Sequence, residues 1–561
     1  MNKKWWKESV VYQIYPRSFM DSNEDGIGDL QGVISKLDYL QKLGIDVIWI
    51  CPIYKSPNDD NGYDISDYQD IMDEFGTMKD FNQLLKEVHQ RGMKLIMDLV
   101  INHTSDEHPW FIESRSSKDN PKRDWYIWRP GKDGKEPNNW ESIFKGSAWE
   151  YDEVTGEYYL HLFSRKQPDL NWENTAVRKE LYKMVTWWLD QGIDGFRIDA
   201  ITFIKKKAGL PDAPNPSGLR CVPAWDCHRN QPGIQDFLGE LKESVFSKYD
   251  IMTVGEADGV LPDEAAFLYT NEVTGKFNML FQFEHMGLDS GPGGKWEVVP
   301  WNLGELKQVI TKWQTGLHNN GWNTSYLENH DQPRSVSRFG DDQKYHKESA
   351  TMLATFLMTL QGTPYIYQGQ EIGMTNVKFD SIEDYRDVES LNLYREHQER
   401  NGNVKPAWDY IYAKGRDNSR TPMQWDATEN AGFTTGIPWL KVNPNYKEIN
   451  VKKSLEDSNS IFYYYQNLIK LRKEHEVFVY GDYDLILENH EKIYAYTRVL
   501  DNETLLIMTN FSNESSEFQM PIHIHYHSKN LLISNYEVEE KDDKISSIFL
   551  KPYEARVYLL K

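Results

Sequence analysis

Four short segments between Met97 and Asp331 each end an apolar, β-branched run with charged side chains. The segments are MDLVINH, GFRIDA, MTVGEAD and YLENHD, and they supply Asp98, His103, Arg197, Asp199, Glu256, His330 and Asp331. One such carboxylate alone is equally well explained as the cap of the next helix, but four in series favour a common site. Asp199, Glu256 and Asp331 are the type of set that hydrolyses a glycosidic bond, which needs a nucleophile and a proton donor around one sugar ring.

The spacing within GFRIDA predicts a nucleophile held by a cation. Arg197 and Asp199 are two residues apart on a predicted strand, so their side chains point the same way. The guanidinium would keep Asp199 ionised and aimed, as a nucleophile requires. A buried ion pair with a purely structural role is the alternative for this pair taken alone, and the other carboxylates favour the catalytic interpretation.

Glu256 is the predicted general acid. It follows the apolar run IMTVG and should lose solvent there, while two neighbouring carboxylates repel its charge. Both effects raise the pKa of a carboxyl group, and a covalent intermediate requires acid and nucleophile about 5 to 5.5 Å apart. Asp331 is expected to grip ring hydroxyls and favour the distorted sugar, and His103 and His330 to donate hydrogen bonds to the same sugar.

Eight apolar runs alternate with amphipathic helical stretches up to about residue 370. This alternation indicates the strands and helices that would position these residues. The runs are VVYQIYPRSF, DVIWICPIY, KLIMDLVINH, GIDGFRIDA, IMTVGEAD, FNMLFQFEH, NTSYLENHD and GTPYIYQGQ. Eight βα units predict an α/β fold, a closed (β/α)₈ TIM barrel, whose active site lies at the C-terminal ends of the strands. The charged residues stand at those ends.

Two segments interrupt or follow the barrel pattern. Residues 104–172 are too long for an ordinary βα loop and predict a small inserted domain that walls the pocket. Short alternating strands over 481–561 predict a C-terminal antiparallel β-sandwich domain. The catalytic barrel is then expected to comprise residues 1–103 and 173–480.

Composition and charge restrict the classes of molecule that the protein is expected to bind. Net charge is -23, from 63 basic against 86 acidic residues, and no stretch gathers Lys and Arg on one face, so nucleic acid and anionic membranes are not expected partners. No apolar run approaches the length of a transmembrane helix, the N-terminus lacks a signal-peptide core, and three cysteines favour free thiols. We expect a cytoplasmic enzyme of small sugars, a monomer or weak homodimer, without an organic cofactor.

An acidic loop near the N-terminus, DSNEDGIGD, resembles a calcium-binding loop. Oxygen donors recur at alternate positions, namely Asp21, Asn23, Asp25, the carbonyl of Ile27, and Asp29. The pattern predicts a structural Ca²⁺ or Mg²⁺, although it differs from an EF-hand in its last position. A turn rich in Asp, Asn and Gly with no ion is the alternative.

With these residues in place, the whole chain resembles the α-glucosidases of glycoside hydrolase family 13, in the oligo-1,6-glucosidase branch. The motifs that carry the resemblance are DLVINHTSDEH, QPDLNWEN, GFRIDA, TVGEAD, ENHDQPR and GTPYIYQGQEIGM. The resemblance implies a retaining, exo-acting enzyme in which Asp199 is the nucleophile, Glu256 the acid/base and Asp331 the transition-state stabiliser. It also implies that the non-reducing glucose is lined by Asp60, Tyr63, His103, Arg197 and His330, with Phe144 and Phe163 nearby. Gln167 and Arg416 are expected at the pocket, with Arg416 nearer the second sugar.

One position departs from the family pattern and bears on linkage. Ala200 follows the nucleophile, where enzymes of this family that favour α-1,6 links commonly carry Val and maltases often carry Thr. A smaller side chain there enlarges the space for the second sugar. We therefore predict a broad α-glucosidase acting on short substrates such as maltose, isomaltose, sucrose or trehalose.

Four other functions fit parts of the pattern. A strict oligo-1,6-glucosidase differs only in linkage, and a sucrose isomerase or transglucosidase would use the same covalent intermediate, although the Arg-rich loop associated with isomerases is not visible after ENHDQPRSVSRFG. A phosphodisaccharide hydrolase would need a cluster of basic residues for phosphate, and none is evident. A catalytically inactive, membrane-associated relative would lack the acidic residues that this chain retains.

Overall fold

The computed structural model describes residues 3–216, 218–539 and 545–561, so the ends of the predicted domain ranges at 1–2 and a stretch at 540–544 lie outside the described residues. The chain forms two compact units. The first unit contains residues 1–48, 91–93 and 284–561, and the second contains residues 49–90 and 94–283. Each unit is described by itself below.

Each of the eight predicted apolar runs contains a strand of one eight-stranded sheet. In the second unit, parallel pairing joins β5 (Lys94–Leu99) to β9 (Gly195–Ile198), β9 to β10 (Met252–Glu256), and β10 to β11 (Met279–Phe281). In the first unit, β15 (Thr363–Tyr367) pairs in parallel with β1 (Val11–Ile14) and β14 (Thr324–Ser325). With β2 (Val47–Ile50), the strand order is β11-β10-β9-β5-β2-β1-β15-β14. The predicted (β/α)₈ fold class is confirmed.

Glycine permits the closest approach between two strands of the second unit. Gly195 opens β9 with φ +144°, and a Cβ built there would lie 1.9 Å from the carbonyl oxygen of Met252 on β10. No other residue fits that contact without moving the strands. The approach fixes the register in which Val254 pairs with Arg197, so Asp199 and Glu256 emerge from neighbouring strand ends.

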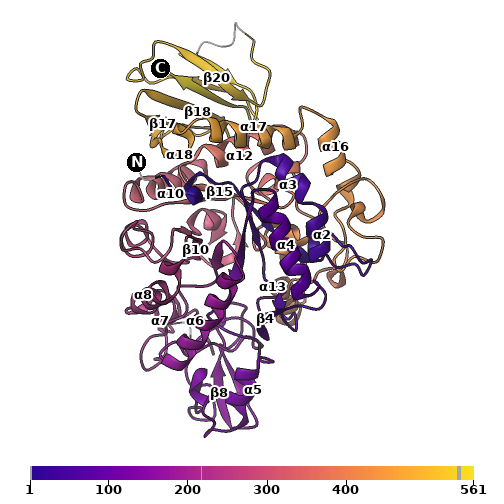
Figure 1. The fold of residues 1–561 in the computed structure, drawn as a ribbon, viewed down its shortest axis with the longest axis vertical. Helices are drawn as coiled ribbons and strands as arrows, with labels where there is room; N and C mark the ends of the chain where they lie inside the picture. The colour runs from indigo at the N-terminus through magenta and orange to yellow at the C-terminus, as the bar shows by residue number, and fades with distance from the viewer. Residues whose placement is uncertain (1–2, 217, 540–544) are drawn as a thin grey trace. The chain divides into compact units, whose positions relative to one another are not determined.

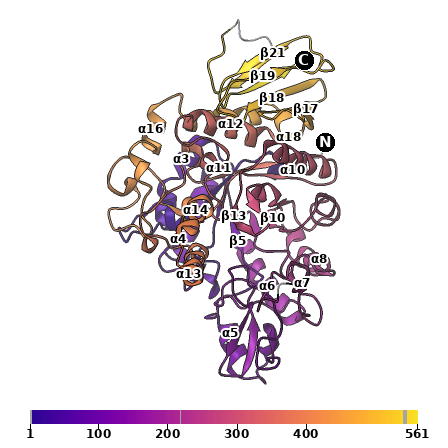
Figure 2. The same cartoon turned by 180° about the vertical axis from the view of Figure 1, so that it is seen from behind.

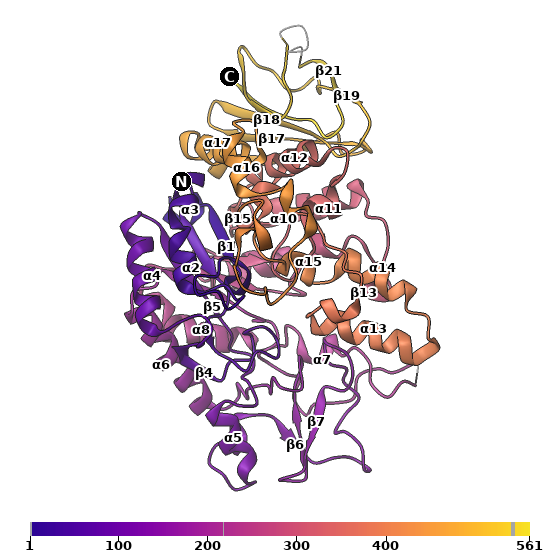
Figure 3. The same ribbon diagram turned by 90° about the vertical axis from the view of Figure 1, so that its right-hand side faces the viewer.

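The long excursion after β5 folds into small elements of its own. Helix α5 (Pro109–Ser116) precedes a three-stranded antiparallel sheet, in the order β6-β8-β7, built from β6 (Trp128–Arg129), β7 (Trp149–Asp152) and β8 (Glu157–Leu160). Figure 3 labels α5, β6 and β7 in this segment. Phe111 stacks on Trp128 at 5.6 Å and meets Tyr159 edge-on at 5.0 Å, so aromatic contacts hold the helix to the sheet. The limits 104–172 stay a prediction.

The C-terminal segment forms two antiparallel sheets that share a core. One has the order β16-β17-β18-β22-β20, from β16 (Asp482–Ile486), β17 (Ile493–Leu500), β18 (Glu503–Asn510), β20 (Lys529–Ser534) and β22 (Ala555–Leu560). The other pairs β19 (Ser516–Gln519) with β21 (Ser547–Leu550), two strands that the sequence pattern had not indicated. Both appear in Figure 2. Buried side chains from both sheets, among them Leu506, Phe518 and Leu550, form one cluster. The predicted C-terminal antiparallel domain is confirmed.

Within the first unit, this domain packs against a helix of the barrel. Helix α12 (His346–Thr359) is buried along nearly its whole length and contacts β18, β22 and α17 (Ile461–Glu474). Figure 1 shows α12 and α17 next to β17 and β18. In the part of the chain that the structure describes, no helix is long and apolar enough to cross a membrane.

Candidate active site

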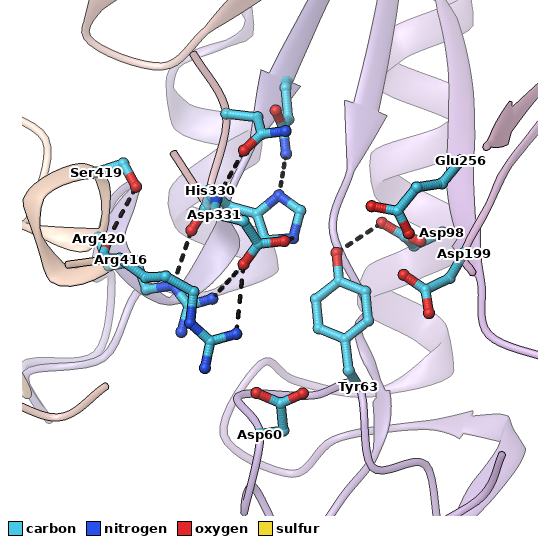
Figure 4. Close-up of polar contacts among 12 residues, drawn as sticks. Asp60, Tyr63, Asp98, Asp199, Glu256, His330, Asp331, Arg416, Ser419 and Arg420 are labelled. Atoms are coloured by element: carbon cyan, nitrogen blue, oxygen red, sulfur yellow. Dashed lines mark hydrogen bonds and ion pairs between the residues drawn. The ribbon is translucent and has the colours of Figure 1, made fainter. Parts of the chain in front are cut away.

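In the second unit, one buried arginine binds three carboxylates. Arg197 Nη1 lies 2.7 Å from Asp98 Oδ1 and 2.7 Å from Asp199 Oδ1, while its Nη2 lies 2.9 Å from Glu256 Oε1. Figure 4 shows Asp98, Asp199 and Glu256 grouped at the strand ends. The guanidinium is 2% exposed, so these ion pairs are shielded from solvent. The predicted Arg197–Asp199 pair is present, and Asp98 completes it.

Asp199 and Glu256 bind the same guanidinium, so the charge of Glu256 bears on the ionisation of Asp199. Burial and the neighbouring Glu256 carboxylate raise the pKa of Asp199, against the opposing effect of Arg197. The raised pKa that the sequence predicts for Glu256 stays a prediction. The backbone N–H of Ala200 donates to Glu256 Oε2 at 2.9 Å, and Arg197 binds its other oxygen, so two donors hold that carboxylate. Two carboxyl groups with different hydrogen-bond surroundings therefore meet at one guanidinium.

Asp98 orients Arg197 and also fixes an aromatic side chain. Its Oδ2 accepts hydrogen bonds from Trp49 Nε1 at 3.1 Å and from the Tyr63 hydroxyl at 3.0 Å. The Tyr63 contact is drawn in Figure 4. Asp98 appeared among the strand-end residues, but its partners come from distant segments, and no spacing in the sequence signals them.

The residues predicted to line the glucose pocket within the second unit lie together. Gln167 Nε2 donates to Asp60 Oδ2 at 3.1 Å and lies 3.2 Å from His103 Nε2. The His103 ring is 5.1 Å from Phe163, which meets Phe144 edge-on at 5.7 Å. A polar group and an aromatic group of the predicted pocket residues therefore lie side by side.

A buried carboxylate holds the loop that carries Asp60. The Oδ atoms of Asp64 accept the backbone N–H groups of Asp59 at 2.8 Å and Asp60 at 3.0 Å. Burial raises the pKa of Asp64 to about 6. Asp64 was not among the predicted site residues, and its position in DDNGYD is the only signal of its role.

In the first unit, Asp331 is held by cations. Arg420 Nη2 lies 2.7 Å from Asp331 Oδ1, His330 Nε2 lies 3.0 Å from Oδ2, and Arg416 Nη1 lies 3.5 Å from Oδ1. Although burial opposes ionisation, these cations hold the pKa of Asp331 well below its usual range. Figure 4 shows both guanidinium groups directed at Asp331. On the other side of the His330 ring, Gln13 Nε2 lies 2.7 Å from Nδ1. Asp331 is therefore a fixed negative charge.

Arg416 is itself positioned by a carboxylate that sequence reasoning missed. Asp387 is fully buried, and its Oδ1 accepts from Arg416 Nε at 2.8 Å. The same side chain caps α13 (Val388–Asn401) by accepting the N–H of Glu389 at 3.1 Å. Arg420 was also missed, although it lies in the stretch KGRDNSR that contains Arg416.

Ala200 has an unusual backbone conformation. Its φ is +48°, its side chain is buried, and it belongs to a core cluster with Phe203. β-branched side chains are rarely found at positive φ, whereas alanine enters the left-handed region at a smaller cost. The small residue therefore suits the turn as well as leaving space beside the carboxylates.

The oxygens of the acidic loop are bonded to the loop itself. Asp21 Oδ1 accepts the N–H of Asn23 at 2.9 Å, Asn23 Oδ1 that of Asp25 at 3.0 Å, and Asp25 Oδ1 that of Ile27 at 2.8 Å. Asp29 caps α2 (Leu30–Ser35) through Gly32. The described residues contain no group of three or more His, Cys, Asp or Glu side chains arranged for a metal. The chain of Asx turns leaves lone pairs on Asn23 and Asp25, so the oxygen set fits a hard cation, and the metal stays a prediction.

The fold and the carboxylate pair together define the class of protein. Residues 13–481 match the alpha amylase catalytic domain and residues 483–557 the maltogenic amylase C-terminal domain, so the chain belongs to glycoside hydrolase family 13 and is a glycosidase. An oligo-1,6-glucosidase of Parageobacillus thermoglucosidasius is 64% identical over 100% of both chains.

Solved structures of related enzymes have the same fold over the full length. A trehalose-6-phosphate hydrolase of Bacillus licheniformis matches with a TM-score of 0.95 at 49% identity, covering 100% of both chains. A trehalulose synthase matches with a TM-score of 0.95 at 44% identity, also over 100% of both chains. The predicted family membership is confirmed.

Proposed function

We propose that the protein is a retaining, exo-acting α-glucosidase that releases terminal α-linked glucose from short oligosaccharides and disaccharides. One observation carries the proposal. Asp199 and Glu256 are bound by the two terminal nitrogens of one guanidinium, so a nucleophile and an acid lie close enough to act on one anomeric carbon. An inverting pair would be separated by the width of a water molecule.

In this mechanism Asp199 attacks the anomeric carbon while Glu256 gives its proton to the leaving oxygen. Binding of the sugar separates the two carboxyl groups, the proton remains with Glu256, and Arg197 stabilises the Asp199 carboxylate. Water then attacks the glucosyl-enzyme with Glu256 as base. Asp331, kept ionised by Arg420 and His330, binds sugar hydroxyls and favours the distorted ring.

The nucleophile and the stereochemistry can be tested separately. Asp199→Asn should abolish hydrolysis of p-nitrophenyl α-glucoside with an unchanged circular dichroism spectrum, while Asp226→Asn, an exposed control in the same unit, should keep wild-type turnover. Substantial residual turnover in Asp199→Asn would overturn the assignment. Proton NMR of the first product should show α-glucose, and β-glucose would contradict a close carboxylate pair.

Linkage preference is proposed to depend on the space left by Ala200. The oligo-1,6-glucosidase relative supports isomaltose-type substrates, and the small buried side chain supports acceptance of maltose as well. Ala200→Val should raise the ratio of isomaltose to maltose turnover, with Ala200→Gly as a control that enlarges the space further. An unchanged ratio in Ala200→Val would remove Ala200 from the account of specificity.

Two alternatives are favoured by related structures. The likeness to a trehalulose synthase supports glucosyl transfer, and that to a trehalose-6-phosphate hydrolase supports a phosphorylated substrate. Incubation with sucrose separates the first, because isomaltulose or trehalulose in excess of glucose and fructose would indicate an isomerase. Faster turnover of trehalose 6-phosphate than of trehalose, maltose or isomaltose would indicate the second.

A further inference from the structure

A buried lysine lies behind the sugar-binding histidine of the second unit and has no part in the proposed reaction. Lys206 Nζ donates to Asp169 Oδ2 at 2.6 Å, Asn102 Oδ1 at 3.0 Å and the Phe203 carbonyl at 2.7 Å. An ammonium has three N–H donors and no acceptor, so these three oxygens use all of them.

The lysine determines which way the Asn102 amide faces. Because Lys206 only donates, Asn102 must turn its Oδ1 towards the ammonium. Its NH₂ group then lies 3.2 Å from Asp169 Oδ2 and 3.2 Å from His103 Nδ1. A flipped amide would bring two donors together at Lys206 and two acceptors together at Asp169. Asn102 therefore presents a donor to His103.

The surroundings of His103 distinguish its two neutral tautomers. The ring is buried, and burial lowers its pKa to about 3, so it is neutral at ordinary pH. His103 Nε2 lies 3.2 Å from the Tyr63 carbonyl and 3.2 Å from Gln167 Nε2. With the proton on Nε2, the ring donates to Tyr63 and accepts from Asn102, while it opposes the Gln167 amide, which donates to Asp60 instead. With the proton on Nδ1, it opposes the Asn102 donor and accepts only from Gln167. Two hydrogen bonds favour the Nε2 proton against one.

We propose that Lys206 is a positioning residue that acts through Asn102 to hold His103 as its Nε2-protonated tautomer. The inference rests on the proposed function for its purpose, since a ring fixed by donating to Tyr63 keeps its place beside Gln167 and Asp60, where the sugar is expected. It adds to that function a group that touches no substrate. A neutral ring with its proton on Nε2 stays a hydrogen-bond donor, and the charge that fixes this tautomer belongs to Lys206, which acts on the ring through Asn102.

The tautomer can be read directly by NMR without substrate, so its test is independent of the proposed reaction. In protein carrying ¹⁵N-histidine, long-range ¹H–¹⁵N correlations distinguish a protonated Nε2 from a protonated Nδ1, and the His103 signals are those lost in His103→Gln. We expect a proton on Nε2 and a lone pair on Nδ1 in the wild type. A proton on Nδ1 would overturn the proposal.

Two variants test the relay. In Asn102→Asp the carboxylate can only accept, so a proton should appear on His103 Nδ1, and kcat/KM for maltose should fall about tenfold, the loss expected for one hydrogen bond. In Lys206→Met the amide is released and both tautomers should appear. Lys205→Met is the matched control, because Lys205 pairs with Glu173 away from Asn102, and it should preserve the wild-type spectrum and turnover.

Each outcome decides the proposal. If Lys206→Met keeps His103 wholly in the Nε2-protonated form, Lys206 does not set the tautomer and the proposal is wrong. If Lys206→Met fails to fold, as judged by circular dichroism, Asn102→Asp decides in its place, because it changes no buried volume. A Nδ1 that stays unprotonated in Asn102→Asp would also overturn the inference, whatever the result of Asp199→Asn.

Discussion

Asp387→Asn isolates the electrostatic part of the contact that positions Arg416. The carboxylate both binds Arg416 Nε at 2.8 Å and caps α13. Asparagine caps a helix about as well as aspartate, so the substitution removes the charge and keeps the cap. Two unit charges about 4 Å apart attract by about 4 kcal/mol at an effective dielectric constant of about 20.

The expected loss of stability is smaller than for an isolated buried pair. Removing one partner of a buried pair costs about 3 to 5 kcal/mol. Arg416 also lies 3.7 Å from Glu389 and 3.5 Å from Asp331, which compensate in part. We therefore expect a loss of about 2.5 kcal/mol. With an unfolding entropy of about 2.1 cal/mol/K per residue over 561 residues, Tm should fall by about 2 °C.

The assay combines thermal melting with kinetics on isomaltose. KM should rise more than kcat falls, because Arg416 is expected at the second sugar. Asp380→Asn, on the exposed part of the same segment, is the matched control, and Asp387→Ala should lose about 1 kcal/mol more through the missing cap. Wild-type Tm and KM in Asp387→Asn would refute the reasoning.

The contribution of Asp387 to the free energy of unfolding should depend on pH with a definite sign. Burial opposes ionisation of Asp387, but Arg416 and Arg420 hold its pKa below the ordinary value. A depressed folded-state pKa contributes stability that is present above the unfolded pKa of about 3.9 and lost as pH falls. The stability difference between wild type and Asp387→Asn should therefore shrink below about pH 4.

Burial raises the pKa of Asp64 to about 6, so the folded chain binds more protons than the unfolded chain between about pH 4 and 6. The contribution of Asp64 to the free energy of unfolding therefore falls as pH rises through this range. Urea unfolding of Asp64→Asn should lack this fall in stability with pH. Gly195→Ala should lower the free energy of unfolding by more than about 4 kcal/mol, because the new Cβ would lie 1.9 Å from Met252 O. Gly92→Ala, with open space around it, should lower it by about 1 kcal/mol. Equal melting temperatures for the two variants would contradict this expectation. EDTA should lower Tm and Ca²⁺ or Mg²⁺ should restore it, and a Tm insensitive to EDTA would show that the DSNEDGIGD loop holds no ion that contributes to stability.

The strands were predictable because each carries its own signal. The strands β1, β9 and β15 are buried on every residue, as a parallel sheet covered on both faces requires. The strands β19 and β21 were missed because each is only four residues long. In addition, exposed apolar residues such as Phe549 break the expected alternation of apolar and polar side chains. Short edge elements depend on packing more than on pattern.

The site was predictable as a set of residues but not as a set of contacts. Asp199 and Glu256 stand at strand ends, where the fold brings side chains together, whereas Asp387 meets Arg416 from a segment whose path no local pattern determines. KGRDNSR contains two arginines, and only the structure shows that Arg420 makes the shorter contact with Asp331. The raised pKa of Asp199 is likewise a property of its burial and of the neighbouring Glu256, which the residue type alone does not reveal.

The three carboxylates around Arg197 have a consequence for the total charge of the buried site. In the proposed mechanism Glu256 begins with a proton, so Asp98, Asp199 and Glu256 with one guanidinium carry a net charge of about minus one. In the proposed first step, Asp199 loses its charge on bonding to glucose while Glu256 acquires one by giving up the proton. The sum is the same before and after. Charge passes between two ligands of one guanidinium, so the protein does not have to bury or release an ion during the reaction.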